Sequence, residues 1–309
     1  MKKLLGFLLI SFLYCSLSYA ESYKIGDQVF NKIILKRNFE IDLSEGNWFM
    51  ARKEHHGFRD IQQKLLGFIR VENGEFMEAY DVYEGDLGGS YIGHVDDSVF
   101  EMTFTDKYDG CYERPEYFVV EFIKKGRVHN CMVVGHWDLI KELNNPDDPQ
   151  EKTASIHYRK FFKENSIKLP SIVLVSWHSY FSRHKRSFWY SINHVINPKI
   201  LNAPKNQYFT EERSEYHKYN IEQFPKHKKI MEEWLSISSK YHKEFEKKNY
   251  AKKHHELDLS RYIISDKEPT QTDDSNDIVQ QIQGLNELYK SGVLTKEEFE
   301  KAKKKLLNK

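Results

Sequence analysis

Cysteine is scarce in this sequence, which has three cysteines in 309 residues. None of them forms a Cys-x-x-Cys motif, so a thiol-redox function has little support. Cys15 lies in an N-terminal segment that we expect to be removed, which leaves Cys111 and Cys131 in the mature chain. An even pair in an oxidising compartment favours a disulfide between Cys111 and Cys131, and two free, buried thiols are the alternative.

The sequence also lacks an excess of charge of either sign. Removal of an N-terminal signal peptide takes two lysines from 47 basic residues and leaves 45 against 46 acidic ones. The mature chain then has a net charge of −1 with histidine neutral. Nucleic-acid-binding domains usually concentrate positive charge, so this balance argues against nucleic acid as the main partner.

No apolar run is long enough to cross a bilayer comfortably. The most apolar one, residues 4–17, follows two lysines at the N-terminus, as in a secretory signal peptide. Ser18 and Ala20 place small residues at the −3 and −1 positions of a signal peptidase site, so we expect cleavage before Glu21. A lipoprotein anchored through Cys15 and an uncleaved anchor are the alternatives. The sequence therefore predicts a soluble bacterial protein, periplasmic or secreted, with no transmembrane segment after cleavage.

Motifs that would name a reaction are absent. The 14 histidines form no His-x-His and no His-Glu-x-x-His motif, so we expect no metal site. The adjacent pairs His55-His56 and His254-His255 are typical of solvated surface. His178 is followed by Ser179, which places a base beside a nucleophile, yet neighbours on a strand point to opposite faces. A Gly-x-Ser-x-Gly elbow is also missing, so a serine hydrolase has little support.

Acidic, glycine-rich and aromatic clusters give no stronger signal. The acidic residues do not have EF-hand spacing, so acidic turns explain them more simply than Ca²⁺ binding. The glycine-rich stretch at residues 85–89 lacks the lysine and the serine or threonine of a phosphate loop, and we expect no cofactor. An aromatic cluster is expected in the core and at a sheet edge rather than in a ligand platform. The acidic residues are Asp81, Glu84, Asp86, Asp96 and Asp97, and the aromatic ones are Tyr180, Phe181, Phe188, Trp189 and Tyr190.

The first half of the mature chain is predicted to be mostly β-structure. Asn73-Gly74 is a strong hairpin turn signal between strands at residues 65–71 and 76–82. Lys125-Gly126 marks a second hairpin. Successive hairpins imply an antiparallel sheet rather than βαβ units. The other predicted strands are residues 31–37, 47–50, 99–104, 117–123, 128–134, 172–181 and 188–196.

Helices are predicted at residues 136–143, at residues 150–164 and, as the longest one, from Pro225 onward. Ile156, Phe161 and Phe162 are expected on or near one face of the second helix. One side of the longest helix is apolar, and lysine, glutamate and histidine fill the other side. Its apolar side consists of Ile230, Trp234, Ile237, Tyr241 and Phe245.

The expected fold class is α+β, with a largely antiparallel β-sheet body and a long C-terminal amphipathic helix. A linker and a small two-helix hairpin follow this body. Residues 265–277 are polar and acidic with no large apolar side chain, which is typical of a flexible linker. The predicted divisions are a signal peptide at 1–20, a globular domain at 21–260, a linker at 261–277 and the hairpin at 278–307.

Local signals in the C-terminal hairpin agree with one another. Gly292 lies where a left-handed C-terminal cap requires a residue without Cβ. Thr295 is expected to cap the second helix, with Glu298 three residues on completing a capping box. The apolar stripes of the two helices consist of Ile278, Ile282, Leu285, Leu288, Phe299, Leu306 and Leu307. A hairpin of this size does not stand alone, so it must dock on its own body, on a copy of itself or on a partner.

The pattern from Leu285-x-x-Leu288 through Gly292-Val293-Leu294-Thr295 to Leu306-Leu307 resembles the short C-terminal domain known as SHOCT. This resemblance implies interaction and oligomerisation, and it brings no catalytic residues. Residues 43–48 and 196–198 of the body are similar to segments of exported bacterial proteins, which implies fold and location but no activity.

Two functions follow. The first is an exported non-catalytic protein whose hairpin mediates oligomerisation or docking, with itself or another envelope protein as the partner. The alternative is a periplasmic enzyme whose site is assembled from scattered residues such as His94, Asp96 and His178. A cleft in which several of these side chains converge would favour the enzyme, and an exposed apolar stripe on the hairpin would favour docking.

Overall fold

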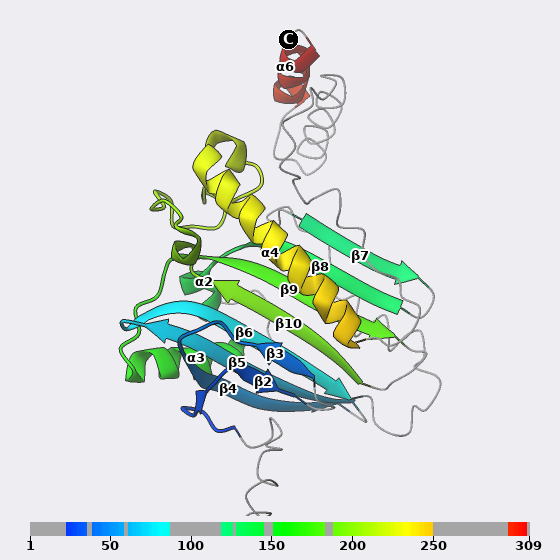
Figure 1. Cartoon of the computed structure of the whole chain (residues 1–309). Helices are drawn as coiled ribbons and strands as arrows, with labels where there is room; N and C mark the ends of the chain where they lie inside the picture. Colours follow the sequence, from blue (N-terminus) through cyan, green and yellow to red (C-terminus); the bar gives the residue numbers. More distant parts are fainter. Residues whose placement is uncertain are drawn as a thin grey trace, which may run out of the picture. The chain divides into compact units, whose positions relative to one another are not determined.

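A computed structural model describes residues 23–35, 39–58, 61–86, 119–125, 128–144, 151–182, 188–249 and 296–307 (Figure 1). The chain divides into two compact units, Met1–Ile263 and Ile264–Lys309. The predicted signal peptide, the linker, the strand at 99–104 and the first helix of the hairpin lie outside the described residues.

The first unit contains a sheet of eight strands in the described part of the chain, in the order β1-β4-β5-β6-β10-β9-β8-β7. Every neighbouring pair runs antiparallel, which confirms the predicted antiparallel sheet. The strands are β1 (Gln28–Val29), β4 (Asn47–Phe58), β5 (Ile61–Glu72), β6 (Glu75–Asp86), β7 (Val119–Lys125), β8 (Val128–Asp138), β9 (Ile172–Ser182) and β10 (Phe188–Ile196).

The two predicted hairpins are confirmed. At the turn between β5 and β6, Asn73 and Gly74 have φ angles of 51° and 73°, the left-handed conformation that a two-residue type I′ turn requires. Strands β7 and β8 pair with Lys125 opposite Val128. Strand β5 begins earlier than predicted. The polar residues that precede its apolar residues also pair with β6.

One pairing joins strands that are distant in sequence. Strand β10 lies between β9 and β6, so His194 is opposite Ser176 on one side and Tyr80 on the other. This pairing joins the β4–β5–β6 strands to the β7–β8–β9 strands in one sheet. No turn signal predicts it, since it depends on contacts between remote segments.

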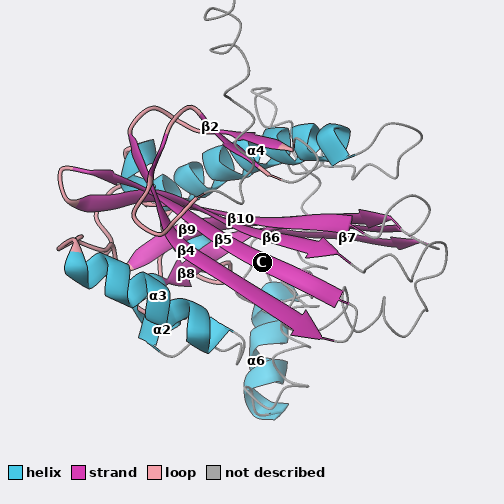
Figure 2. Ribbon diagram, turned by 90° about the horizontal axis from the view of Figure 1, so that it is seen from below, coloured by secondary structure: helices cyan, strands magenta, loops and turns pink. Residues whose placement is uncertain are grey.

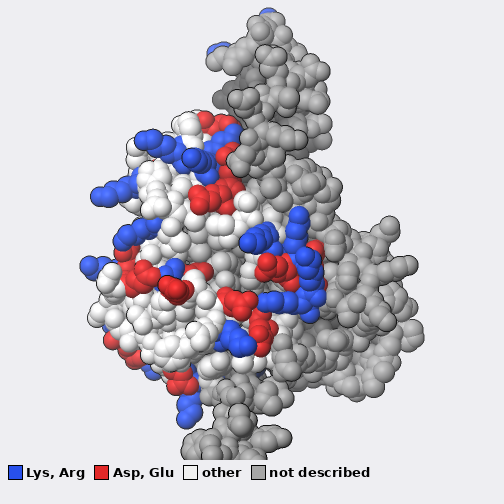
Figure 3. All heavy atoms as spheres, viewed as in Figure 1, with Lys and Arg blue, Asp and Glu red and all other residues white. Residues whose placement is uncertain are grey.

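Each face of the sheet is covered by a different set of elements. Helix α4 (Pro225–Asn249) and the small sheet of β2 (Lys32–Ile34) and β3 (Glu40–Asp42) lie on one face. Helices α2 (Leu139–Asn144) and α3 (Glu151–Glu164) lie on the other (Figure 2). Charged side chains of both signs are interspersed on the face of the molecule seen in Figure 3, as the balanced composition predicts.

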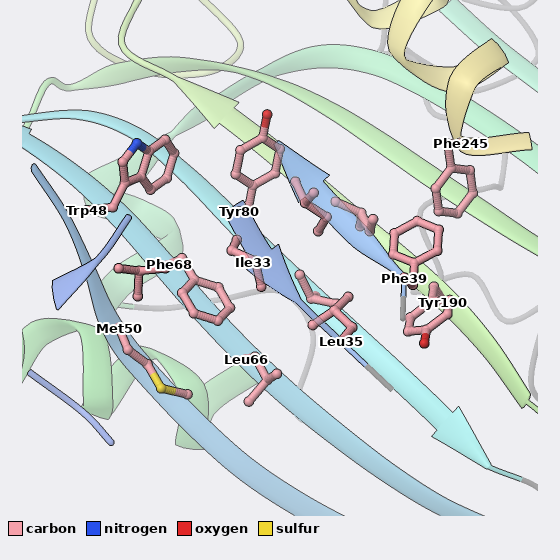
Figure 4. Close-up of a cluster of buried hydrophobic side chains, with 14 of the residues drawn as sticks. Ile33, Leu35, Phe39, Trp48, Met50, Leu66, Phe68, Tyr80, Tyr190 and Phe245 are labelled. Carbon is pink, nitrogen blue, oxygen red and sulfur yellow. The ribbon is translucent and has the colours of Figure 1, made fainter. Parts of the chain in front are cut away.

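An aromatic core fills the space between the small sheet and β4, β5 and β6 (Figure 4). The Trp48 ring stacks on Tyr80 with centroids 5.6 Å apart, and Phe39 stacks on Tyr190 at 4.5 Å. Phe245 from α4 meets the edge of Phe39, so the helix and the small sheet share this core. The predicted placement of Tyr190 and of Tyr180 in the core is confirmed. The side chains of Phe181, Phe188 and Trp189 lie outside the described residues.

Helix α4 begins at Pro225, as predicted, and Ile230, Trp234 and Phe245 of its predicted apolar side are buried. Ile237, expected inside, is 38% exposed, whereas His242 and Glu246 are buried. The buried side also includes these polar residues, because hydrogen bonds to the sheet offset the cost of burying them. Ile230, Met231, Trp234 and Leu235 supply the apolar part of the contact.

Two further sequence predictions on the opposite face are corrected. Residues 136–138, predicted as the start of a helix, continue strand β8, which pairs with β9 through Asp138. Ile156 is 55% exposed, and Tyr158 is buried with Phe161 and Phe162 instead. Residues 158, 161 and 162 share one side of a 3.6-residue period, and residue 156 lies on the other.

The second unit contains helix α6 (Lys296–Leu307) among its described residues. The helix begins one residue after Thr295, where the predicted N-cap puts it. Within the described residues, no helix is long and apolar enough to span a bilayer.

Candidate functional site beneath helix α4

A chain of polar side chains lies in the interface between α4 and the sheet. Alternation along β9 places Ser176 and His178 on the same face, and the register with β8 places Asn130 beside them. His242 and Glu246 are one turn apart on the inner side of α4. All of these side chains are buried, with exposed fractions of 0% for the first four and 3% for Glu246.

Hydrogen bonds link the five side chains in sequence. Ser176 Oγ is 2.9 Å from His178 Nε2, and His178 Nδ1 is 3.0 Å from His242 Nδ1. His242 Nε2 is 2.9 Å from Asn130 Oδ1. Asn130 Nδ2 donates to Glu246 Oε1 at 2.5 Å. The chain therefore runs from a hydroxyl on the sheet to a carboxylate on the helix.

The carboxylate at one end fixes the direction of every bond. An ionised Glu246 can only accept, so Asn130 presents its amide to it and its Oδ1 to His242. His242 donates from Nε2, and a neutral His242 then accepts at Nδ1 from His178. His178 accepts at Nε2 from the Ser176 hydroxyl. Every contact is satisfied with both imidazoles neutral.

Burial supports the neutral state of His178. The loss of solvation, followed by the charges of His242 and His194, holds the pKa of His178 well below its usual value of 6.5. An added proton on Nε2 would reverse the hydrogen bond with Ser176 and would place an unpaired charge in the buried interface. This chain of hydrogen bonds is therefore favoured at neutral pH and weakened by acid.

The order of hydroxyl, imidazole and carboxylate is that of hydrolytic triads, but the surroundings are not. Ser176 Oγ is enclosed between the sheet and α4, so a substrate has no access to it in this arrangement. Ser179, which follows His178 in sequence, points to the opposite face and accepts a hydrogen bond from Ser191 at 2.7 Å. The arrangement therefore fastens the helix to the sheet and presents no nucleophile to the surface.

A second polar group continues this interface toward β6. Glu78 Oε1 lies 2.7 Å from His194 Nε2, and Oε2 accepts from Arg70 Nε at 3.0 Å and from Ser44 Oγ at 2.6 Å. Burial by itself would raise the pKa of Glu78. The hydrogen bond and charge of His194, the hydrogen bond from Ser44 and the charge of Arg70 together outweigh burial and lower this pKa. The Tyr80 ring stacks on His194 with centroids 4.3 Å apart. Glu78 is therefore held as a carboxylate.

Those of the other sequence candidates that the structure describes do not converge. Asp81 and Glu84 point to opposite faces of β6, so they do not share a ligand. The Asp81 carboxylate accepts from the Tyr158 hydroxyl, and Glu84 lies 3.8 Å from Lys64. Among the described residues, no group of three His, Cys, Asp or Glu side chains could hold a metal ion. His94, Asp96, Asp97, His254 and His255 and the side chains of His56 and Asp86 lie outside the described residues.

Sequence reasoning singled out His178 but missed its partners. Two signals were available: the i, i+2 spacing of Ser176 and His178 on a predicted strand, and the i, i+4 spacing of His242 and Glu246 on a predicted helix. Neither signal indicates that the strand and the helix meet. Asn130, which joins them, carries no sequence signal of its own.

One cysteine of the predicted disulfide and most of the predicted interaction side chains lie outside the described residues. Cys131 is buried in β8, and Cys111 lies outside the described residues, so the bridge stays a prediction. Phe299 is half-buried on α6, with Lys303 Nζ 5.8 Å from its ring centroid. The side chains of Ile278, Ile282, Leu285, Leu288, Leu306 and Leu307 lie outside the described residues.

Comparison with protein families identifies the C-terminal segment. Residues 280–307 match the family SHOCT, described as a short C-terminal domain. No curated protein and no solved structure matches the chain. The match confirms the resemblance read from the capping residues and apolar spacing of the hairpin. The chain therefore carries a SHOCT domain at its C-terminus.

Proposed function

We propose that this chain is an exported, non-catalytic protein whose SHOCT domain docks on a second copy of the chain or on another envelope protein. The observation that carries the proposal is the family match at residues 280–307, in a unit of its own beyond the body. Domains of this family are small C-terminal modules. Such a module at the end of a folded body is compatible with a non-catalytic role.

The make-up of α6 supports docking. Phe299, Ala302 and Leu306 recur at helical spacing along one side of α6. Lysines occupy most of the remaining positions, with Lys301 and Lys304 exposed. A helix of 12 residues is marginal in isolation, so its apolar side needs a surface to cover it.

The body supports a non-catalytic role. The best candidate for chemistry, His178, is enclosed with Ser176 beneath α4 and is occupied by hydrogen bonds on both ring nitrogens. A catalytic base must reach a substrate proton, which requires access that His178 lacks in this arrangement.

The experiment that tests docking measures the native mass of the mature chain and of a double variant, Leu285→Asp with Phe299→Asp. Two carboxylates on the apolar side oppose burial of that side, so we expect a fall in native mass or the loss of a co-purifying envelope protein. Thermal unfolding of the body should stay nearly unchanged.

A control carries Lys301→Asp with Lys304→Asp, which places two carboxylates at exposed positions of α6 and changes the net charge even more than the test variant does. We expect this control to keep the native mass of the parent chain. The proposal fails if the Leu285→Asp, Phe299→Asp variant lowers the melting temperature of the body, because the hairpin would then belong to its core. It also fails if mass, binding and melting all stay the same.

A further inference from the structure

The segment that leads into α4 reverses the usual rule of burial. Between residues 203 and 224, Glu215 is fully buried and Glu211 is 8% exposed, whereas Tyr208, Phe209 and Tyr219 are 42%, 58% and 53% exposed. Carboxylates are ordinarily left in water and aromatic rings are buried. The fold here turns two acids inward and three rings outward.

This reversal is built into the segment. The Glu215 carboxylate accepts hydrogen bonds from the backbone N–H groups of Gln207 and Tyr208, which fixes the backbone that carries the exposed rings. Tyr216 and Ile221 are buried in the core beneath α4. Asn220 Nδ2 donates to two backbone carbonyls of the same segment, at 3.0 and 3.2 Å. The rings are therefore held outward on an anchored backbone.

The same region carries an excess of positive charge at its surface. Residues 203–229 contain six basic residues, all exposed or half-exposed: Lys205, Arg213, Lys218, Lys226, Lys228 and Lys229. Only Glu212 and Glu222 expose a negative charge there, and Glu222 pairs with Lys228 at 2.7 Å. Figure 3 shows Lys and Arg side chains along the edge of the molecule where α4 begins. The excess is local, since the chain as a whole is close to neutral.

We infer that this aromatic and basic surface, residues 203–229, binds the anionic phospholipid surface of a membrane. Tyrosine and phenylalanine rings lie favourably at the depth of the lipid headgroups, where their apolar bodies leave water. Lysine and arginine side chains extend to the phosphates and are attracted by the negative surface potential. A soluble polyanion would satisfy the charges but would leave the three rings in water.

Vesicle sedimentation with the full chain tests the inference. Vesicles of phosphatidylcholine with phosphatidylglycerol should pull down the protein, with weaker binding at high salt, and vesicles of phosphatidylcholine alone should bind it much less. An aromatic variant carries Tyr208→Ser, Phe209→Ser and Tyr219→Ser, and a basic variant carries Lys205→Ser, Lys226→Ser and Lys229→Ser. Because both ring burial and charge contribute, we expect each variant to lower the partition coefficient at least about tenfold.

A control variant carries Phe30→Ser and Lys160→Ser, which removes an exposed ring and an exposed lysine elsewhere on the body. It should bind as the parent chain does. Circular dichroism of all variants should be unchanged, because every substituted side chain is exposed. The Leu285→Asp, Phe299→Asp variant should also keep its vesicle binding, which separates this inference from docking by the SHOCT domain.

Three results would overturn the assignment. One is an absence of binding to the anionic vesicles. Another is binding that neither the aromatic nor the basic variant reduces. The third is binding lost in the basic variant but retained in the aromatic one, which would indicate a general polyanion surface such as that of an acidic protein.

Discussion

His178 is held by partners that determine its proton state. Its two ring nitrogens face Ser176 and His242, and burial disfavours a second proton, which would place a charge in this enclosed interface. His194, the next histidine on this face, is fixed in turn by Glu78 and by stacking on Tyr80. A histidine on a buried sheet face therefore acts here as a polar contact whose strength depends on pH.

This dependence gives a prediction for stability. The pKa of His178 is lowered in the folded state below the 6.5 of the unfolded chain, so the unfolded state binds a proton that the native state refuses. The stability that this neutral His178 contributes is complete above pH 6.5 and is lost as the pH falls below that value. One such group changes the free energy of unfolding by up to about 1.4 kcal/mol per pH unit. Urea unfolding between pH 7.5 and pH 5 measures the slope.

The comparison that isolates His178 is the slope of a His178→Gln variant against that of the parent chain. The variant should be less stable at neutral pH but should lose less stability on acidification. His55→Gln, the same substitution at an exposed position, is the control for the change of residue type. Identical slopes for the parent and His178→Gln would contradict the assignment. His136, whose pKa burial lowers to about 4, accounts for part of the slope that remains.

Helix α4 is attached to the sheet by two kinds of contact. Trp234 packs in the apolar part of the interface and donates from its ring nitrogen to the Val175 carbonyl at 3.1 Å. Farther along the helix, His242 and Glu246 bond to side chains of β8 and β9. The apolar contact supplies most of the favourable free energy, and the polar one satisfies the hydrogen-bonding groups buried with it.

Replacement of His242 by leucine should therefore weaken the attachment of α4. It leaves His178 Nδ1 and Asn130 Oδ1 without the ring that lies between them, and each buried group that loses a partner costs about 1–3 kcal/mol. We expect a loss of about 2–4 kcal/mol in the free energy of unfolding, measured in urea. Lys243→Leu, on the exposed side of the same turn, should change it by less than about 0.5 kcal/mol. Equal stabilities for the two variants would show that the polar chain does not hold the helix.

At the scale of the whole molecule, the predicted export would determine the redox state of the cysteines. The lysine-led apolar segment at residues 4–17 and the small residues Ser18 and Ala20 predict a mature chain that begins at Glu21. An oxidising compartment would then favour a bridge between Cys111 and Cys131.

A single intact-mass measurement on protein taken from the cell envelope checks both expectations. We expect the mass of residues 21–309, less two hydrogens for one disulfide, and no thiol that alkylates without reduction. A chain that begins at a lipid-modified Cys15, or that keeps Met1, would refute cleavage before Glu21. Two alkylated thiols in the same preparation would refute the bridge.

The sequence alone was sufficient for features whose causes are local. The Asn73-Gly74 dipeptide predicted its hairpin because a type I′ turn requires left-handed residues at both positions. The predicted cap at Gly292, the predicted capping box at Thr295 and the apolar spacing of residues 285–307 were likewise local signals, and they identified the SHOCT domain. Each of these signals lies within a few residues of the structure that it determines.

The tertiary structure decided which of these elements meet. His242 and Asn130 are 112 residues apart in sequence, and Glu78 and His194 are 116 apart, yet both pairs form buried hydrogen bonds. Their contact depends on the pairing of β6 with β10 and on the packing of α4, which leaves Ile237 outside and Glu246 inside. A periodicity of 3.6 residues predicts the apolar side of a helix. It does not predict the burial of a histidine or a glutamate whose hydrogen-bond partner is on a strand. Hydrogen bonds between remote segments exist only once the register of the sheet is set, and this is why the chain beneath α4 could not be read in advance.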